Sequence, residues 1–239
     1  KTRISVLPTG LDRVSFQYDE MLSSEIRNMY GNGCPYLFAT TARLEKEKNL
    51  DFLFRGTARL RDILGQDFRL MVIGDGTERR HLEELARMLG ISRQIVFTGK
   101  IENTRVRHYL NAADAFLFAS KSETQGIVLL EAMAAGCPVA AVRASGVVDV
   151  VRQGINGYMT EEAPEAFAAA AARLVLERGV WSGMSEEARK TAELYESGRI
   201  AALAAEQYGL MTGQKEDAGY EEHGKGMLVP SILRLFKAA

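Results

Sequence analysis

The stretch Ala115–Val142, AFLFASKSETQGIVLLEAMAAGCPVAAV, decides the fold. It opens with a short apolar run, Ala115–Ala119, which is typical of a buried strand, and it continues through a polar loop into a helical pattern at Ile127–Ala135. A second apolar run, Val139–Val142, follows a glycine-containing turn. A strand, a helix and a strand in this order predict two parallel strands joined by a crossover helix.

The same alternation extends on both sides of this stretch. Further strands are expected at Tyr36–Ala42, Phe68–Ile73, Ile95–Thr98 and Gly157–Thr160. Helical patterns lie at Leu50–Leu64, Glu78–Leu89, Arg105–Asn111 and Gly146–Val151. The sequence therefore predicts an α/β fold in which helices cover both faces of a doubly wound parallel sheet.

The strands cease after Thr160, and extra C-terminal helices are expected. One begins at Pro164 and ends at Arg178-Gly179, and two more cover Trp181–Tyr195 and Ser197–Tyr208. We expect one domain over residues 1–211, which starts with a strand-like run at Ile4–Leu7. Residues 212–239 read as a linker and an amphipathic tail, which docks on a partner domain or contacts a membrane surface.

The composition excludes several classes of function. With 30 basic and 31 acidic residues, the net charge of -1 offers no bulk attraction to nucleic acid, so no nucleic-acid partner is expected. The 2 cysteines form no C-x-x-C pair and the 3 histidines lie far apart, so no metal site is expected. No apolar run approaches the roughly 20 residues of a membrane span, and we expect a cytoplasmic protein. The chain begins with Lys1 rather than methionine, which fits an excised fragment.

Glycines and charged residues follow each predicted strand. In an open parallel sheet, ligands bind outside the carboxyl ends of the strands, so these residues predict a site at one edge. The segments concerned are Arg43–Lys48, Gly74–Gly76, Gly99–Ile101, Ser120–Gly126 and Arg143–Gly146.

Two of these segments have both a functional and a structural interpretation. Arg43 and Lys48 are permanent cations suited to a diphosphate, but Glu45, Lys46 and Glu47 around them also fit a solvated charge run. The glycine at Gly74 lets a ligand approach the backbone closely, and a tight strand-to-helix turn explains it equally well. Neither G-x-G-x-x-G nor a phosphate-loop motif is completed.

Glu123 and Glu131 are the most informative pair of carboxylates. A helix would separate them by about 12 Å, more than the roughly 5–9.5 Å between the carboxylates of glycosidase pairs. They therefore indicate two roles along one extended ligand, with the N–H groups at Gly126-Ile127 available to an anion. The structural alternative makes Glu123 a charge at a helix start and Glu131 a surface residue. Because Glu131 is surrounded by apolar neighbours, a polar partner is predicted for it.

These motifs together resemble the family-4 retaining glycosyltransferases, which have two Rossmann-like domains facing a cleft, the GT-B fold. The resemblance is to the C-terminal, donor-binding half and covers roughly residues 1–210. It rests on the order and spacing of VLPTGLD (Val6–Asp12), ARLEKEKNL (Ala42–Leu50), VIGDG (Val72–Gly76), VFTG (Val96–Gly99) and ETQGIVLLEAMAAGCPV (Glu123–Val139). The last of these is its strongest marker.

The resemblance implies a role for each matching residue. Arg43 and Lys48 look like the cations that hold the donor diphosphate, Glu123 like the residue that contacts the transferred sugar, and Glu131 like the acceptor of ribose hydroxyls. Ile101 matches the backbone position that reads the base. The implied donor-binding set is completed by Gly74, Thr124, Gln125, Gly126 and Ile127.

The resemblance also implies the reaction. A hexose would pass from a nucleotide-sugar, UDP-glucose or a similar UDP-sugar, to an acceptor with retention of anomeric configuration. Neither a cofactor nor a metal is expected, because D-x-D is missing. The N-terminal acceptor domain is absent, so the fragment alone should bind donor without turnover. Pro8-Thr9-Gly10 and the ETQG loop are similar to the lipid-glycosylating subset, which implies a membrane-lipid acceptor and a peripheral position on the inner membrane face.

Two other functions remain open on this fold. A sugar-nucleotide epimerase shares the architecture, although the paired glutamates with Arg43 and Lys48 favour the transferase. A non-catalytic nucleotide-binding module would be expected to lose these charged pairs, which are intact here.

Overall fold

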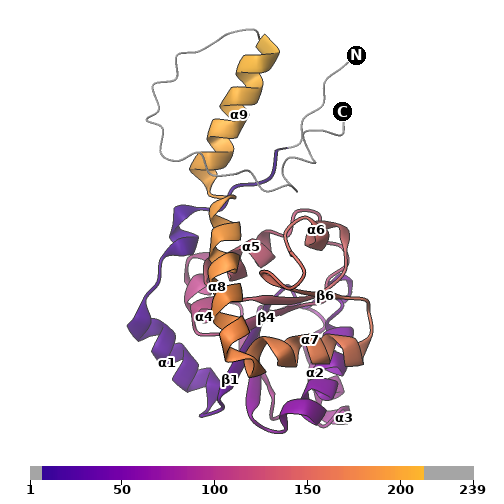
Figure 1. The fold of residues 1–239 in the computed structure, drawn as a ribbon. Helices are drawn as coiled ribbons and strands as arrows, with labels where there is room; N and C mark the ends of the chain where they lie inside the picture. The colour runs from indigo at the N-terminus through magenta and orange to yellow at the C-terminus, as the bar shows by residue number, and fades with distance from the viewer. Residues whose placement is uncertain (1–6, 213–239) are drawn as a thin grey trace.

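The computed structural model describes residues 7–212 (Figure 1). The predicted tail beyond Thr212 and all of the predicted Ile4–Leu7 strand except Leu7 lie outside these residues, and Leu7 itself is not in a strand.

Six parallel strands form one sheet in the order β3-β2-β1-β4-β5-β6, as the α/β prediction requires. Their bounds agree with the predicted runs to within one residue: β1 (Tyr36–Thr41), β2 (Phe68–Ile73), β3 (Ile95–Gly99), β4 (Ala115–Phe118), β5 (Val139–Val142) and β6 (Gly157–Thr160). The chain runs outward in one direction from β1 to β3 and then returns to place β4 on the other side of β1. This reversal makes the gap between the carboxyl ends of β1 and β4 the switch point, where such sheets bind ligands.

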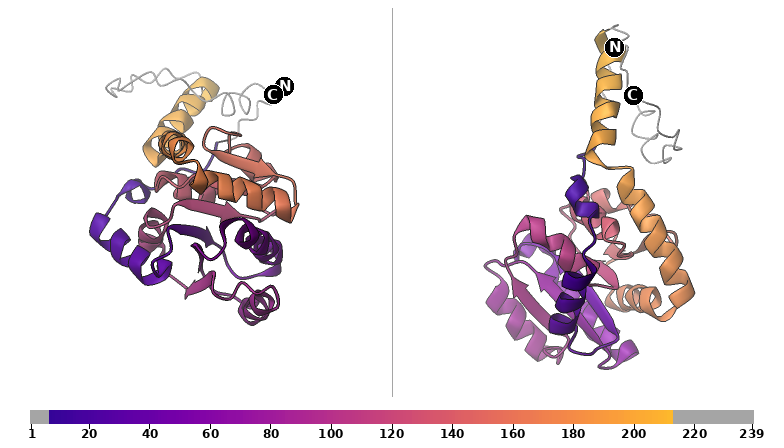
Figure 2. Two further views of the ribbon diagram at one scale, coloured as in Figure 1. Left: turned by 60° about the horizontal axis from the view of Figure 1, so that its bottom comes forward. Right: turned by 90° about the vertical axis from the view of Figure 1, so that its left-hand side faces the viewer.

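Helices cover both faces of the sheet (Figures 1 and 2). Successive residues of β1 point to opposite faces, so Phe38 packs in one core and Leu37 in the other. The first core lies under α2 (Leu50–Leu64), α3 (Arg79–Met88) and α7 (Pro164–Leu176). The second core lies under α1 (Glu20–Gly31), α4 (Asn103–Asn111), α5 (Ile127–Ala134) and α8 (Arg178–Glu193). Because both faces are buried, the strands read as continuous apolar runs.

Helix α1 was not predicted from the sequence. The Asp19 side chain caps it by accepting from the Leu22 N–H at 3.0 Å, and it ends at Asn32 in the left-handed conformation (φ 50°). Within it, Ile26 is buried while Met21 and Met29 are more than 70% exposed. Its narrow apolar stripe explains why periodicity did not reveal it.

The predicted end of the helix from Pro164 is wrong. Helix α7 ends at Leu176, and α8 begins at Arg178, so Gly179 lies inside α8 rather than stopping α7. The final helix, α9 (Ser197–Thr212), projects away from the sheet and its covering helices (Figure 1; Figure 2, right). None of the helices within residues 7–212 is both long enough and apolar enough to span a membrane.

Two short 3-10 helices and one short α-helix complete the described chain. They are η1 (Arg13–Phe16), η2 (Lys46–Lys48) and α6 (Ser145–Val148). The segment before η1 is anchored where α8 meets α9: the Leu11 N–H donates to the Tyr195 carbonyl at 2.6 Å, and the Ser197 N–H donates to the Leu11 carbonyl at 2.9 Å.

Candidate functional site

The loops that follow β1 and β4 meet at the switch point. Lys48 ends η2 in the first loop and Glu123 lies in the second, and their Nζ and Oε2 atoms are 3.9 Å apart. Both side chains are about four-fifths buried, with 21% and 20% of their surface exposed. The fold therefore brings a cation and a carboxylate from the two predicted segments into one ion pair.

An asparagine network that the sequence did not predict holds these loops together. Asn49 adopts the left-handed conformation (φ 55°) between η2 and α2. Its Nδ2 donates to the Ala119 carbonyl at 3.2 Å and to the Glu162 carboxylate at 2.7 Å. The Lys121 ammonium also pairs with Glu162, and both donors hold the pKa of that carboxyl below its ordinary value. The network ties together the loops after β1, β4 and β6 around the Lys48–Glu123 pair.

Arg43 lies on the same loop as Lys48 but faces solvent. Its guanidinium pairs with Glu47 at 3.3 Å, and 74% of its side chain is exposed. Such an exposed pair is weak, so the guanidinium can leave Glu47 at little cost. The geometry is compatible with both interpretations of Arg43, a phosphate contact and a solvated charge.

The glycines after β2 are explained by packing against the Arg43 loop. Gly74 has φ 134°, and a Cβ there would overlap the carbonyl oxygen of Ala42. A Cβ at Gly76 would lie 2.5 Å from the Leu44 carbonyl oxygen. The tight-turn interpretation of Gly74 therefore has a direct physical cause, and its role toward a donor stays a prediction.

Helix α5 begins at the site without a side-chain cap. Gly126 precedes it with φ 66°, in the left-handed region that favours glycine. Within residues 7–212, the N–H groups of Ile127 and Val128 have no backbone acceptor and lie at the positive end of the helix dipole, whereas those of Leu129 and Leu130 donate to the Gly126 carbonyl. Thr124 and Gln125 beside them are exposed, and the Gln125 side chain accepts a hydrogen bond from Thr9.

Gly146, in α6, contacts the backbone of the loop that contains Glu123. Its N–H donates to the Glu123 carbonyl at 3.1 Å, and a Cβ there would lie 2.6 Å from that oxygen. This segment reads Ala144-Ser145-Gly146, so it holds a single glycine. That glycine, Gly146, is the residue that the close contact with the Glu123 carbonyl requires.

Glu131 is the fifth residue of α5, about one turn into the helix, and lines a small cavity. Val14, Ser15 and Arg107 from η1 and α4 line the same cavity. Within residues 7–212, no hydrogen bond or ion pair reaches the carboxylate, so the described chain does not supply the polar partner predicted for it. Burial raises the pKa of Glu131 above its ordinary value of 4.5. Ile101 packs against the same core as α5.

The described chain contains no group of three or more His, Cys, Asp or Glu side chains placed to hold a metal ion. The switch point therefore brings together the Lys48 cation, the Glu123 carboxylate, the exposed Arg43 on the same loop as Lys48 and the start of α5, whereas Glu131 lines a separate small cavity. Such a set suits an anionic, hydroxyl-rich ligand.

Comparison with known proteins identifies the family. Residues 25–192 match the model for glycosyl transferases group 1. Alpha-monoglucosyldiacylglycerol synthase of Streptococcus pneumoniae is 35% identical over 148 residues, which are 59% of this chain and 33% of the synthase. This chain thus spans only about a third of that relative.

Two solved structures share the fold. The HepE protein of Anabaena, in complex with UDP, superposes with a TM-score of 0.78 at 21% identity over 86% of this chain and 57% of its own. The C-terminal domain of the group 1 protein LpcC from Francisella tularensis gives 0.68 at 23% identity over 78% of this chain and 99% of its own. The fold is thus that of the Rossmann-like domains in GT-B enzymes, and the family match over residues 25–192 shows that this chain belongs to the glycosyl transferases group 1 family.

Proposed function

We propose that this chain is the donor-binding half of a retaining glycosyltransferase that moves a hexose from a UDP-sugar to an acceptor. The Lys48–Glu123 pair at the switch point carries the proposal. It places a cation suited to phosphate beside a carboxylate suited to a sugar, close to the start of α5, which has no side-chain cap. The UDP in the HepE structure supports the choice of base.

Each group has a distinct task in the proposed reaction. Breaking the sugar–phosphate bond leaves negative charge on the diphosphate, which Lys48, Arg43 and the N–H groups of Ile127 and Val128 stabilise. Glu123 orients the hexose, and Glu131 accepts hydrogen bonds from the ribose. The acceptor attacks from the face that the diphosphate leaves, which retains the anomeric configuration.

The acceptor is proposed to be a membrane lipid, bound by a further domain outside these 239 residues. The Streptococcus pneumoniae relative, whose name records a glucosyldiacylglycerol product, favours this class. An epimerase on the same architecture would instead release an altered nucleotide-sugar, which product analysis of the complete enzyme detects.

Thermal unfolding of the chain with UDP, GDP and ADP tests donor binding. At 100 times its Kd, UDP should stabilise the chain by about 2.7 kcal/mol and raise Tm by roughly 5–11 °C. The shift should survive EDTA and decrease with salt, because the attraction is partly screened Coulomb energy. The proposal is contradicted if no nucleotide changes the Tm, or if nucleotide binding strictly requires Mg²⁺ or Mn²⁺.

Glu123→Gln separates sugar binding from nucleotide binding. The variant should lose the increment in affinity that the hexose adds to UDP, while UDP alone binds equally well or slightly better because Lys48 loses its carboxylate neighbour. Calorimetry with UDP and UDP-glucose measures both terms. Glu161→Gln, at an 83% exposed position on the same edge, is the control. Loss of UDP binding in Glu123→Gln would assign this carboxylate to another role.

A further inference from the structure

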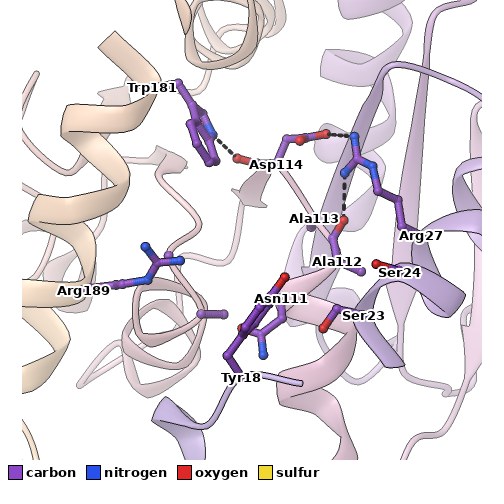
Figure 3. A pocket seen from close by; sticks show the side chains of 12 residues that line it. Tyr18, Ser23, Ser24, Arg27, Asn111, Ala112, Ala113, Asp114, Trp181 and Arg189 are labelled. Carbon is purple, nitrogen blue, oxygen red and sulfur yellow. Dashed lines mark hydrogen bonds and ion pairs between the residues drawn. The ribbon is translucent and has the colours of Figure 1, made fainter. Parts of the chain in front are cut away.

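A second cavity, of about 220 Å³, lies at the amino edge of the sheet (Figure 3). Its floor is formed by Ala112–Asp114, which precede β4, and by Gly136, which precedes β5. Side chains from α1 and α8 form its walls. Because all six strands are parallel, this edge is opposite the one that holds Lys48 and Glu123. The cavity is therefore separate from the proposed donor site.

One wall carries Arg27, whose guanidinium is held in place by hydrogen bonds and paired with a carboxylate. Arg27 donates to the Ala112 and Pro35 carbonyls and to the Asp114 carboxylate, each at 2.9 Å. The Asp114 carboxylate also accepts from the Leu37 N–H at 2.7 Å. Three acceptors fix this guanidinium, and the charges of Arg27 and Asp114 compensate each other.

The opposite wall carries an uncompensated charge. The Arg189 guanidinium lies over Gly136, where a Cβ would stand 2.5 Å from its Cζ atom. Glycine is needed at position 136 because its φ of 82° is in the left-handed region and because a Cβ would overlap the Arg189 guanidinium. Within residues 7–212, no hydrogen bond or ion pair reaches Arg189, although Glu193 is four residues further along α8. Figure 3 shows the guanidinium directed inward, across the cavity from Ser23, Ser24 and Arg27.

A hydroxyl on α1 adds an unsatisfied polar group. Ser23 lines the cavity and is only 3% exposed, and its Oγ has no hydrogen-bond partner within the described residues 7–212. The neighbouring hydroxyl of Ser24 lines it as well. A buried hydroxyl without a partner is costly, and a small rotation of this side chain would turn it toward an acceptor in the cavity.

We propose that this cavity binds a phosphate group, carried by a small phosphate ester or by a phospholipid headgroup. A guanidinium binds phosphate oxygens in a bidentate manner, and Arg189 is the cation at this cavity that lacks a counter-charge. The volume is several times the roughly 30 Å³ that a water molecule occupies, which accommodates a phosphate with part of its ester. Tyr18, which lines the cavity and is exposed, would face the acyl region in the lipid case.

The single tryptophan of the chain makes the site measurable. Trp181 lines the cavity, and its indole N–H donates to the Asp114 carbonyl at 2.6 Å. Titration with inorganic phosphate and with glycerol 3-phosphate, at constant ionic strength, should change its fluorescence saturably, and calorimetry provides a second readout. Arg189→Gln should weaken binding roughly tenfold or more.

Lys190→Gln is the matched control, because Lys190 is the adjacent cation but pairs with Glu186 and Glu187 away from the cavity. It should bind phosphate like the wild type. Equal weakening in both variants would mean that the anion senses only overall charge, which overturns the proposal.

Vesicles distinguish the two sources of phosphate. Co-sedimentation with phosphatidylcholine vesicles, with and without phosphatidic acid, should depend on Arg189 if the headgroup is the ligand; binding of the soluble esters alone assigns a free phosphate compound. Absence of Arg189-dependent binding to every one of these probes refutes the site. UDP binding should be unchanged in Arg189→Gln, so this test and the donor-binding test fail independently.

Discussion

Replacing Glu131 with glutamine is expected to weaken UDP and UDP-glucose by the same factor, on the order of 10–150. The carboxylate is half-buried on α5 and has no partner within residues 7–212, so the ribose hydroxyls would be its first hydrogen-bond donors. Both ligands carry the ribose, and both should lose the same interaction. Calorimetry on wild type and variant measures the two factors. An effect confined to UDP-glucose would exchange the roles of the two glutamates.

The same substitution should stabilise the chain without ligand. Burial raises the pKa of Glu131 above 4.5, so the folded state favours the protonated carboxyl. The stability from this group is fully present below pH 4.5 and is lost as the pH rises through the raised pKa. Urea unfolding should therefore show Glu131→Gln more stable than wild type at pH 7, with the difference closing toward pH 4. An equal or lower stability of the variant at pH 7 would mean that the carboxylate is well solvated.

Lys48→Ala is expected to lower the affinity for UDP by a similar factor, about 10–150. The ammonium is mostly buried beside Glu123, so it acts on the diphosphate with little screening by water. Arg43→Ala falls in the same range and should lie at its lower end, because that guanidinium is 74% exposed. Titration of UDP at several salt concentrations measures both effects.

Lys46→Ala provides the control for these cations, since Lys46 is exposed on the same loop. It should change UDP affinity little. Because Lys48→Ala also leaves Glu123 without its cation, the double variant with Glu123→Gln isolates the diphosphate contribution. If Lys48→Ala leaves the UDP affinity unchanged, the Arg43–Lys48 segment is a solvated run of charges and not a phosphate-binding loop.

Regular elements could be predicted because local signals agree with the packing. The predicted bounds Leu50–Leu64 match those of α2, whose buried side chains form an apolar stripe against the sheet. Helix α1 lacks such a wide stripe, and the stop assigned to Gly179 was wrong because one non-helical residue, Glu177 (φ -94°, ψ 76°), is enough to separate α7 from α8.

The candidate site could be predicted by position but not by contact. Residues that follow parallel strands must share an edge, which is how Lys48 and Glu123 could be grouped from the sequence. The network of Asn49, Lys121 and Glu162 joins residues up to 113 positions apart, and no local pattern encodes it. Gly74 had two interpretations from the sequence, and the structure supplies a cause for the tight turn, because the backbone that Gly74 accommodates lies in another loop.

The ion pair between Lys48 and Glu123 has a consequence for which anions the edge can select. In the unliganded chain the two charges neutralise each other, so an arriving anion competes with a carboxylate that is already in place. A monovalent ion such as chloride or acetate offers Lys48 no more charge than Glu123 already does. A diphosphate brings higher valence and can also reach Arg43 and the start of α5. The Glu123 carboxylate thus favours binding of multivalent anions at this edge over binding of common monovalent anions.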